Sequence, residues 1–104
     1  MPEIKSLQES DFSGDAFKAV DRMAVLFESP WCQGCHAVEK MILGMIETEA
    51  QGCQWGKVDV STQQEVAQRF GVLSLPTLLV FHEGQLKERM VGKISKEKLL
   101  KAIK

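Results

Sequence analysis

Trp31-Cys32-Gln33-Gly34-Cys35-His36 is the stretch that decides the fold of this chain. It follows the wholly apolar segment Met23-Ala24-Val25-Leu26-Phe27, which is typical of a central strand covered on both faces. It precedes a segment with apolar residues at the period of an amphipathic helix, namely Val38, Met41, Ile42, Met45 and Ile46. The two cysteines therefore lie at a predicted strand-to-helix junction.

This position has a chemical consequence for the two thiols. The free N–H groups and the positive dipole end at a helix start favour an anion, so a thiolate at Cys32 is stabilised. Cys35 lies one helical turn further on, on the same face, and can close an intramolecular disulfide. We predict that Cys32 is the nucleophile and Cys35 the resolving thiol of a redox-active pair. His36 is either a solvent-facing residue or, when protonated, a group that lowers the pKa of a neighbouring thiol.

Composition limits the class of protein. A chain of 104 residues, 44% hydrophobic and 26% charged, is expected to form one globular domain over residues 1–104. The net charge of -1 gives no electrostatic case for binding nucleic acid or an anionic membrane. Residues 1–6 lack the pattern of an export signal, and a cysteine pair with one cysteine left over favours redox chemistry in a reducing compartment. We expect a cytoplasmic protein.

Outward from the central stretch, the remaining elements can be assigned in order. We expect an edge strand at 3–7, a helix capped by Ser10, a central helix ended by Gln51-Gly52, a strand at 53–60, a short helix capped by Ser61 or Thr62, a hairpin at 77–91 and a closing helix capped by Ser95. The apolar positions of the first helix, Phe12, Ala16, Phe17 and Val20, are expected to fall on one face. This order predicts an α/β fold with a mixed central sheet and helices on both faces, in which crossovers join the first three strands.

With these elements in place, the chain resembles a thioredoxin. The resemblance rests on Trp31-Cys32-x-x-Cys35 after an apolar strand, on Leu75-Pro76-Thr77 at the head of a later strand, and on Gly92 after the hairpin. It extends over nearly the whole chain and implies the thioredoxin fold and protein-disulfide reductase activity with no bound cofactor. It also implies disulfide-bearing protein substrates and, as electron donor, a flavin-dependent reductase that uses NADPH.

The resemblance further implies how substrate is held. The peptide bond before the family's proline is cis, which here implies a cis Leu75-Pro76 bond with the Leu75 backbone beside the dithiol. That backbone can pair with an extended substrate segment. The residues expected to form the substrate groove are Trp31, Gln33, Gly34, Leu75, Pro76 and Gly92, with the loop 71–74 at the rim.

Two departures from the family pattern affect the chemistry. Gln33-Gly34 replaces the usual Gly-Pro, so the start of the helix and the stabilisation of the thiolate can differ. Leu26 occupies the position of a buried aspartate that exchanges a proton with the resolving cysteine. Glu28 lies two residues along the same predicted strand and so points to the same face. We hypothesise that Glu28, paired with Lys57, supplies the missing proton acceptor.

Four other interpretations fit parts of the sequence. The stretch 32–36 matches a haem attachment motif, and Cys32, Cys35 and Cys53 with His36 or His82 match zinc ligands by type. Leu26 and the altered dipeptide also suit a redox-weak module that only binds peptides, and sequence alone leaves open an oxidase or isomerase. Cys53 is most simply a small packed residue.

Overall fold

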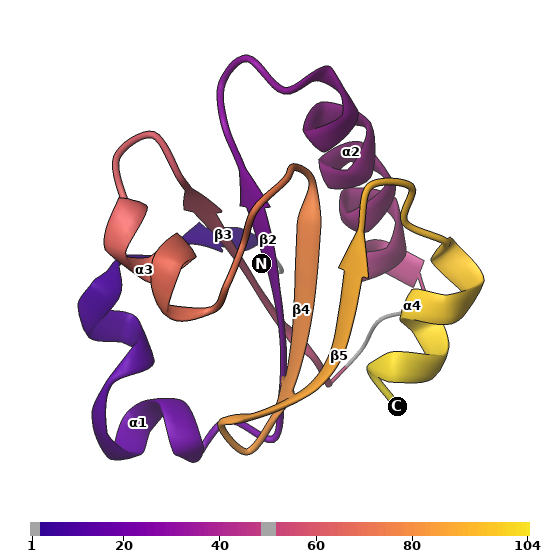
Figure 1. Ribbon diagram of the computed structural model, residues 1–104. Helices are drawn as coiled ribbons and strands as arrows, with labels where there is room; N and C mark the ends of the chain where they lie inside the picture. Colours follow the sequence, from indigo (N-terminus) through magenta and orange to yellow (C-terminus); the bar gives the residue numbers. More distant parts are fainter. Residues whose placement is uncertain (1–2, 49–51) are drawn as a thin grey trace.

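A computed structural model describes residues 3–48 and 52–104 and places a five-stranded sheet between two helical layers (Figure 1). The elements in chain order are β1 (Ile4–Ser6), the 3₁₀ helix η1 (Glu9–Phe12), α1 (Gly14–Lys18), β2 (Arg22–Glu28), α2 (Gln33–Thr48), β3 (Gln54–Asp59), α3 (Gln64–Arg69), β4 (Thr77–His82), β5 (Gln85–Val91) and α4 (Lys96–Ala102). The predicted order of strands and helices is confirmed.

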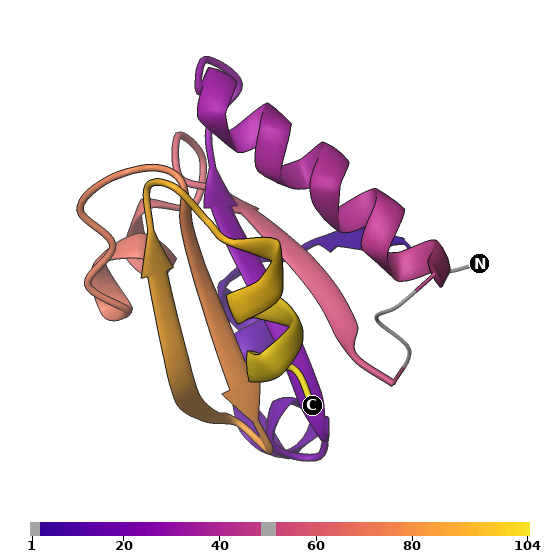
Figure 2. The same cartoon turned by 90° about the vertical axis from the view of Figure 1, so that its right-hand side faces the viewer.

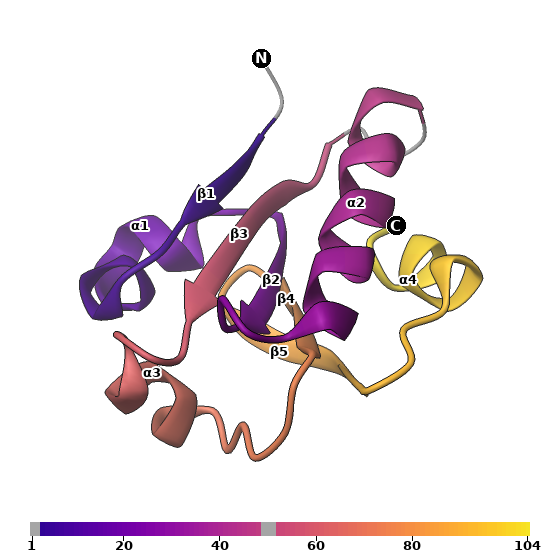
Figure 3. The ribbon, with the colours of Figure 1, turned by 90° about the horizontal axis from the view of Figure 1, so that it is seen from above.

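The strands lie in the order β1-β3-β2-β4-β5. β3 pairs in parallel with both β1 and β2, whereas β4 pairs antiparallel with β2 and β5. The parallel strands are joined by crossovers that contain helices, as parallel pairing requires. Viewed from above, α1 and α3 cover one face of the sheet and α2 and α4 cover the other (Figure 3). The mixed sheet with helices on both faces is therefore confirmed.

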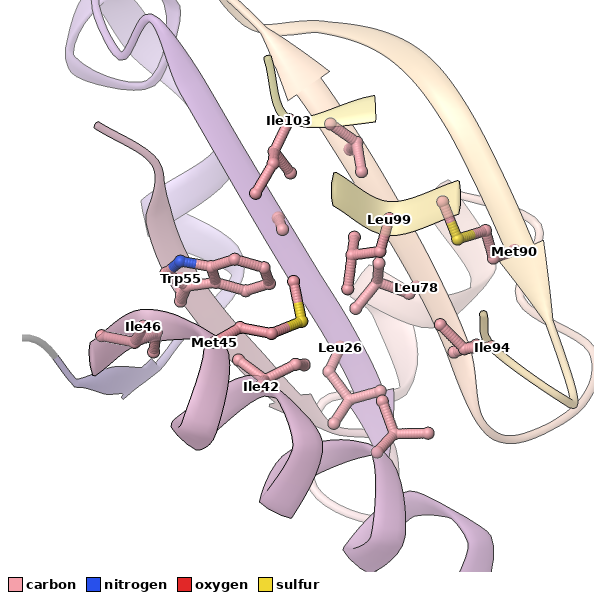
Figure 4. Close-up of a cluster of buried hydrophobic side chains, with 13 residues drawn as sticks. Leu26, Ile42, Met45, Ile46, Trp55, Leu78, Met90, Ile94, Leu99 and Ile103 are labelled. Carbon is pink, nitrogen blue, oxygen red and sulfur yellow. The ribbon is translucent and has the colours of Figure 1, made fainter. Parts of the chain in front are cut away.

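Strand β2 contributes to a separate hydrophobic cluster on each face. Ala24 and Leu26 point toward α2 and α4, while Val25 and Phe27 point toward α1 and α3, and all four are completely buried. The first cluster is mostly aliphatic and also contains Trp55 (Figure 4). The second contains the buried rings of Phe12, Phe17, Phe27 and Phe81. Burial on both faces explains why the segment is uninterruptedly apolar.

The first helical region differs from the prediction. The expected continuous helix capped by Ser10 is divided into η1 and α1, and Ala16 is exposed. Gly14 has φ +80°, a conformation that glycine adopts readily, so the chain turns between the two elements. The turn still brings Phe12 and Phe17 together, with ring centroids 5.4 Å apart. Packing of these two rings therefore survives the break in the helix.

Helix α2 is the longest helix of the described residues and carries the dithiol. Its buried residues include Val38, Ile42, Met45 and Ile46, which confirms the predicted apolar stripe. It begins at Gln33, before the expected start near Cys35. The described part ends at Thr48, and the expected end at Gln51 lies outside the described residues. Within 3–48 and 52–104, no helix has the length and apolar character needed to cross a membrane.

The N-cap prediction is wrong for α3 and confirmed for α4. Neither Ser61 nor Thr62 caps α3; both side chains bond to Asp59 instead, and the N-cap position is Gln63. The hydroxyl of Ser95 accepts a backbone N–H at the start of α4, as predicted. The Ser61 and Thr62 prediction is wrong because Asp59, at the end of β3, supplies nearer partners for both hydroxyls.

One end of the sheet gathers three connections that are distant in sequence. The loop between β2 and α2, the entry to β4 and the connection from β5 to α4 all lie at the upper end in Figure 1. Turned by 90°, α2 and α4 both lie in front of the sheet, with α2 starting at this upper end (Figure 2). This arrangement brings the dithiol, Pro76 and Gly92 to the same end of the molecule.

Candidate active site

Cys32 and Cys35 form a disulfide at the start of α2. Their Cα atoms are 5.2 Å apart, and Cys35 is the third residue of the helix. The backbone N–H of Cys35 donates to Sγ of Cys32 at 3.1 Å. One of the helix's free first-turn donors therefore points at the sulfur of Cys32, as the strand-to-helix placement predicted.

The two sulfur-bearing residues differ in exposure. Cys35 is completely buried, with Sγ 3.9 Å from the carbonyl oxygen of Phe27 in the adjacent strand, whereas Cys32 is partly exposed. Cys32 is held by its own N–H, which donates to the carbonyl of Ser29 at 3.2 Å. Only the Cys32 side of the disulfide is open to another molecule.

The loop before β4 packs against the dithiol helix. The Leu75-Pro76 bond is cis, as the resemblance implied, and the carbonyl of the buried Pro76 accepts the N–H of Gly92 at 2.8 Å. A Cβ added at Gly34 would lie 3.5 Å from Cδ of Pro76, so the first turn of α2 directly faces the proline. The structure thus brings together Gly34, Leu75, Pro76 and Gly92.

Apolar surface lies at this end of the molecule. Among the predicted groove residues, Trp31 is 78% exposed and Gln33 is also exposed, and Leu73 of the rim loop is 97% exposed. A groove of about 300 Å³ connects the first turns of α2 to the loop after β5; it is lined by Gly34, Ala37, Val38, Met41, Gly92, Lys93 and Ile94. Sequence reasoning assigned Met41 only to the core. Its position at the edge of the apolar stripe was the signal that it could also line a surface.

The expected ion pair between Glu28 and Lys57 is not formed. Nζ of Lys57 instead lies 2.9 Å from Oε1 of Glu39, a residue of α2. Burial raises the pKa of Glu28, and the negative charge of Glu39 raises it further, whereas the positive charge of Lys57 lowers it. The correction follows from packing: the flank of α2 lies over β3, which brings Glu39 to Lys57.

His36 is exposed on the first turn of α2. Its backbone N–H donates to the carbonyl of Cys32 at 3.3 Å. A positive charge on its ring lowers the pKa of Glu28, as the smallest of the contributions to that pKa.

Cys53 is remote from the other two cysteines. It immediately precedes β3, while Cys32 follows the parallel strand β2, so the two lie at opposite ends of the sheet. Burial raises the pKa of Cys53 to about 12. Over the described ranges, no group of three or more His, Cys, Asp and Glu side chains could hold a metal ion, so the proposed zinc ligands are not brought together.

The site and the sheet together define a class of protein. A disulfide at the start of a helix, with one accessible sulfur and with the loop of Pro76 packed against the same helix turn, is suited to reversible exchange with other disulfides. The chain is a thiol–disulfide oxidoreductase with Cys32 and Cys35 as its redox centre.

The comparisons with known proteins identify the family. The Thioredoxin family model matches residues 3–104, and the chain belongs to the thioredoxin family. It is 32% identical over 99 residues to thioredoxin of Bacillus subtilis, covering 95% of this chain and 92% of that protein. It is 25% identical over 101 residues to "Thioredoxin M4, chloroplastic" of Arabidopsis thaliana, covering 97% of this chain but spanning only 52% of that protein's length.

Solved structures agree with the fold. A mutant thioredoxin from Halobacterium salinarum superposes with a TM-score of 0.84 at 26% identity, covering 97% of this chain and 88% of that one. The element order, the sheet order and this similarity establish the thioredoxin fold.

Proposed function

We propose that this chain, acting as a single domain over residues 1–104, reduces disulfide bonds in other proteins. The observation that carries the proposal is the unequal exposure of the two cysteines at the start of α2. An accessible sulfur that receives a helix N–H suits nucleophilic attack, and a buried sulfur one turn away suits release of the substrate.

The reaction consists of two exchanges. The Cys32 thiolate attacks one sulfur of the substrate disulfide; a mixed disulfide forms and the other substrate sulfur leaves as a thiolate, which takes a proton from water. Cys35 then loses its proton and attacks Sγ of Cys32. The Cys32–Cys35 bond forms, the mixed disulfide breaks and the second substrate thiolate leaves. Two electrons have passed from the dithiol to the substrate.

Glu28 is the proposed acceptor of the Cys35 proton. Leu26 is completely buried and carries no ionisable group, so the face that points toward α2 offers Glu28 as the next carboxyl along β2. Burial raises the pKa of Glu28, which brings the carboxyl closer to the pH at which a base exchanges protons efficiently. Lys57 and the exposed His36 act on this carboxyl through their charges rather than through direct ion pairs.

The substrate is proposed to bind as an extended segment across the end of the sheet. The backbone of Leu75 would pair with that segment, and the groove beside α2 would receive an apolar side chain. The residues proposed to line the binding surface are Trp31, Gln33, Gly34, Leu75, Pro76 and Gly92.

An electron donor is needed to regenerate the dithiol. We propose an NADPH-dependent flavin reductase, in a cytoplasmic setting, with no role for nucleic acid or membrane. A relative named "Bifunctional thioredoxin reductase/thioredoxin" from Mycobacterium leprae supports a reductase partner: it is 30% identical over 93 residues, with 89% of this chain covered and 20% of that protein.

Trapping of substrates tests the proposal against a module that only binds peptides. Cys35→Ser leaves Cys32 able to attack but removes the resolving thiol, so mixed disulfides with a disulfide-bearing protein such as insulin should accumulate on non-reducing gels. The variant Cys32→Ser is the control and should trap nothing. Failure of Cys35→Ser to form any adduct would favour the peptide-binding module, in which the groove persists without redox chemistry.

The direction of electron transfer is tested by the reduction potential of the Cys32–Cys35 pair. Equilibration in thiol/disulfide buffers, read by alkylation and mass, should give a value near ~−270 mV for a general reductase. A value in the range ~−180 to −120 mV would instead assign the chain as an isomerase or oxidase.

A further inference from the structure

Five titratable side chains from three elements gather around the end of β2. β2 contributes Glu28, β3 contributes Lys57 and Asp59, and α2 contributes His36 and Glu39. Glu28 and Asp59 are register partners at the ends of the two parallel strands. Glu28, Lys57 and Asp59 also line one polar pocket of about 280 Å³, whose other lining residues are uncharged. Within this group a change in the charge of one member acts on its neighbours.

Within the group, Lys57 is held by Glu39. The 2.9 Å contact joins residues that are 18 positions apart, and the two side chains are only 31% and 24% exposed. The hydrogen bond that Lys57 donates to Glu39 is the main reason that the pKa of Lys57 is raised. Across the parts of the chain that the structure describes, Glu28 has no ion pair of its own, although it shares a pocket with Lys57. Glu39 therefore binds the lysine that lines the same pocket as Glu28.

The charges that act on Glu28 come from two neighbouring elements, α2 and β3. From α2, Glu39 repels a negative charge on Glu28 and His36 attracts it; from β3, Asp59 repels it and Lys57 attracts it. Burial is the largest contribution to the raised pKa of Glu28, and the repulsion by Glu39 and Asp59 adds to it. Glu39 acts on Glu28 twice, through its own charge and through its hold on Lys57.

We propose that Glu39 is a positioning residue for the dithiol: by pairing with Lys57, so that Lys57 forms no ion pair with Glu28, it keeps Glu28 as the carboxyl that takes the proton from Cys35 and passes it to solvent. The inference rests on the proposed reductase function. In the step concerned, the S–H bond of Cys35 breaks and the proton passes to the Glu28 carboxylate. The electron pair left on sulfur forms the Cys32–Cys35 bond, and the substrate sulfur leaves Cys32 with the electron pair of the mixed disulfide. The polar pocket gives the protonated Glu28 a path to water.

A titration of Glu28 tests the arrangement directly. The oxidised protein, labelled with carbon-13 at glutamate side-chain carboxyls, is titrated by NMR, and the Glu28 signal is assigned from its loss in Glu28→Gln. We expect Glu39→Gln to move the Glu28 midpoint to lower pH, because a negative charge is removed and Lys57 is released. We expect Lys57→Met to move it to higher pH. Two variants with opposite shifts cannot be explained by a general loosening of the fold.

The matched control is Glu47→Gln, the same substitution at an exposed position further along α2. It should leave the Glu28 midpoint unchanged. If Glu39→Gln also leaves the midpoint unchanged, the proposal is overturned.

The kinetic arm uses the reduced protein and the aromatic disulfide 5,5′-dithiobis(2-nitrobenzoate). Attack by Cys32 releases one thionitrobenzoate and resolution by Cys35 releases the second, so the second phase reports the step in question. At neutral pH, Glu28→Gln should slow the second phase at least about tenfold. The pH at which this phase accelerates should move in the same direction as the Glu28 midpoint in Glu39→Gln and Lys57→Met.

The two arms separate the inference from the function on which it rests. If the wild-type protein shows no second phase, the reductase function fails, while the titration still decides whether Glu39 sets the protonation of Glu28. If the Glu28 midpoint shifts but the second phase does not follow it, Glu39 has no part in the chemistry and the proposal is overturned.

Discussion

The dithiol and Cys53 place the same functional group in two opposite environments. Cys32 sits at the carboxyl end of a parallel strand, partly exposed, with a helix N–H donated to its sulfur. Cys53 sits at the amino end of the neighbouring parallel strand and is also partly exposed, but it lies outside any helix start, and desolvation raises its pKa to about 12. The reactivity of a cysteine in this fold thus depends on which end of the sheet it occupies.

The physical reason is the direction of the chain. In a parallel pair joined by a crossover, strands end where helices begin, so helix N–H groups gather at the carboxyl ends. The amino ends of the strands receive the chain as it leaves a helix and offer no such donors. At Cys53, desolvation is the largest contribution and favours the protonated form, while a backbone hydrogen bond with Ala24 and the charge of Arg22 act in the opposite direction.

The strongest test of the comparison removes each thiol in turn. Cys32→Ser should abolish all measurable reduction of insulin by this chain with dithiothreitol as electron donor, because no attacking thiolate remains. Cys53→Ser should retain nearly full activity. Loss of activity in Cys53→Ser, with the fold intact by circular dichroism, would contradict the separation of the two environments.

Alkylation rates sharpen the comparison without mutation. At pH 7, with a pKa of about 12, only about one Cys53 thiol in 100,000 is ionised, so iodoacetamide should reach it far more slowly than Cys32 in the reduced protein. Peptide mapping after timed quenching measures both sites in one sample. In denaturant the difference should largely disappear, since both thiols then have an ordinary pKa; a difference that persisted would have a cause other than the fold.

The smallest expected effect is on stability at alkaline pH. The Cys53 thiol has an ordinary pKa of 9.0 and a folded pKa of about 12, so between these values the unfolded chain loses a proton that the folded chain keeps. Unfolding then releases a proton and becomes easier as pH rises, by at most about 1.4 kcal/mol per pH unit from this one group. Urea unfolding of the oxidised protein should show a steeper loss of stability above pH 9 than that of Cys53→Ala. Equal slopes would mean that Cys53 is not protected by burial.

Sequence patterns predicted the strands and helices well wherever the spacing of apolar residues over a short segment was clear. The apolar run of β2 and the stripe from Val38 to Ile46 each depend on neighbours a few residues away, and both are confirmed. The first helix was predicted less well, because the local pattern does not reveal that Gly14 adopts a left-handed conformation.

The site was predicted in part for a similar reason. The motifs around Cys32 and Pro76 located the dithiol and its cis-proline, which belong to one family pattern. The partner of Lys57 could not be found in this way, because it depends on how the flank of α2 settles over β3. Only the packing of these two elements identifies Glu39 as the partner of Lys57.

The complete burial of Cys35 beside the partly exposed Cys32 has a consequence for the flow of electrons. An incoming thiol that reduces the disulfide and an outgoing substrate that is reduced by the dithiol must both bond to the same sulfur. Donor and acceptor therefore take turns at a single contact point and never occupy the protein together. In the proposed reaction the chain therefore transfers two electrons per cycle, and the electron donor and the substrate compete for access to Cys32.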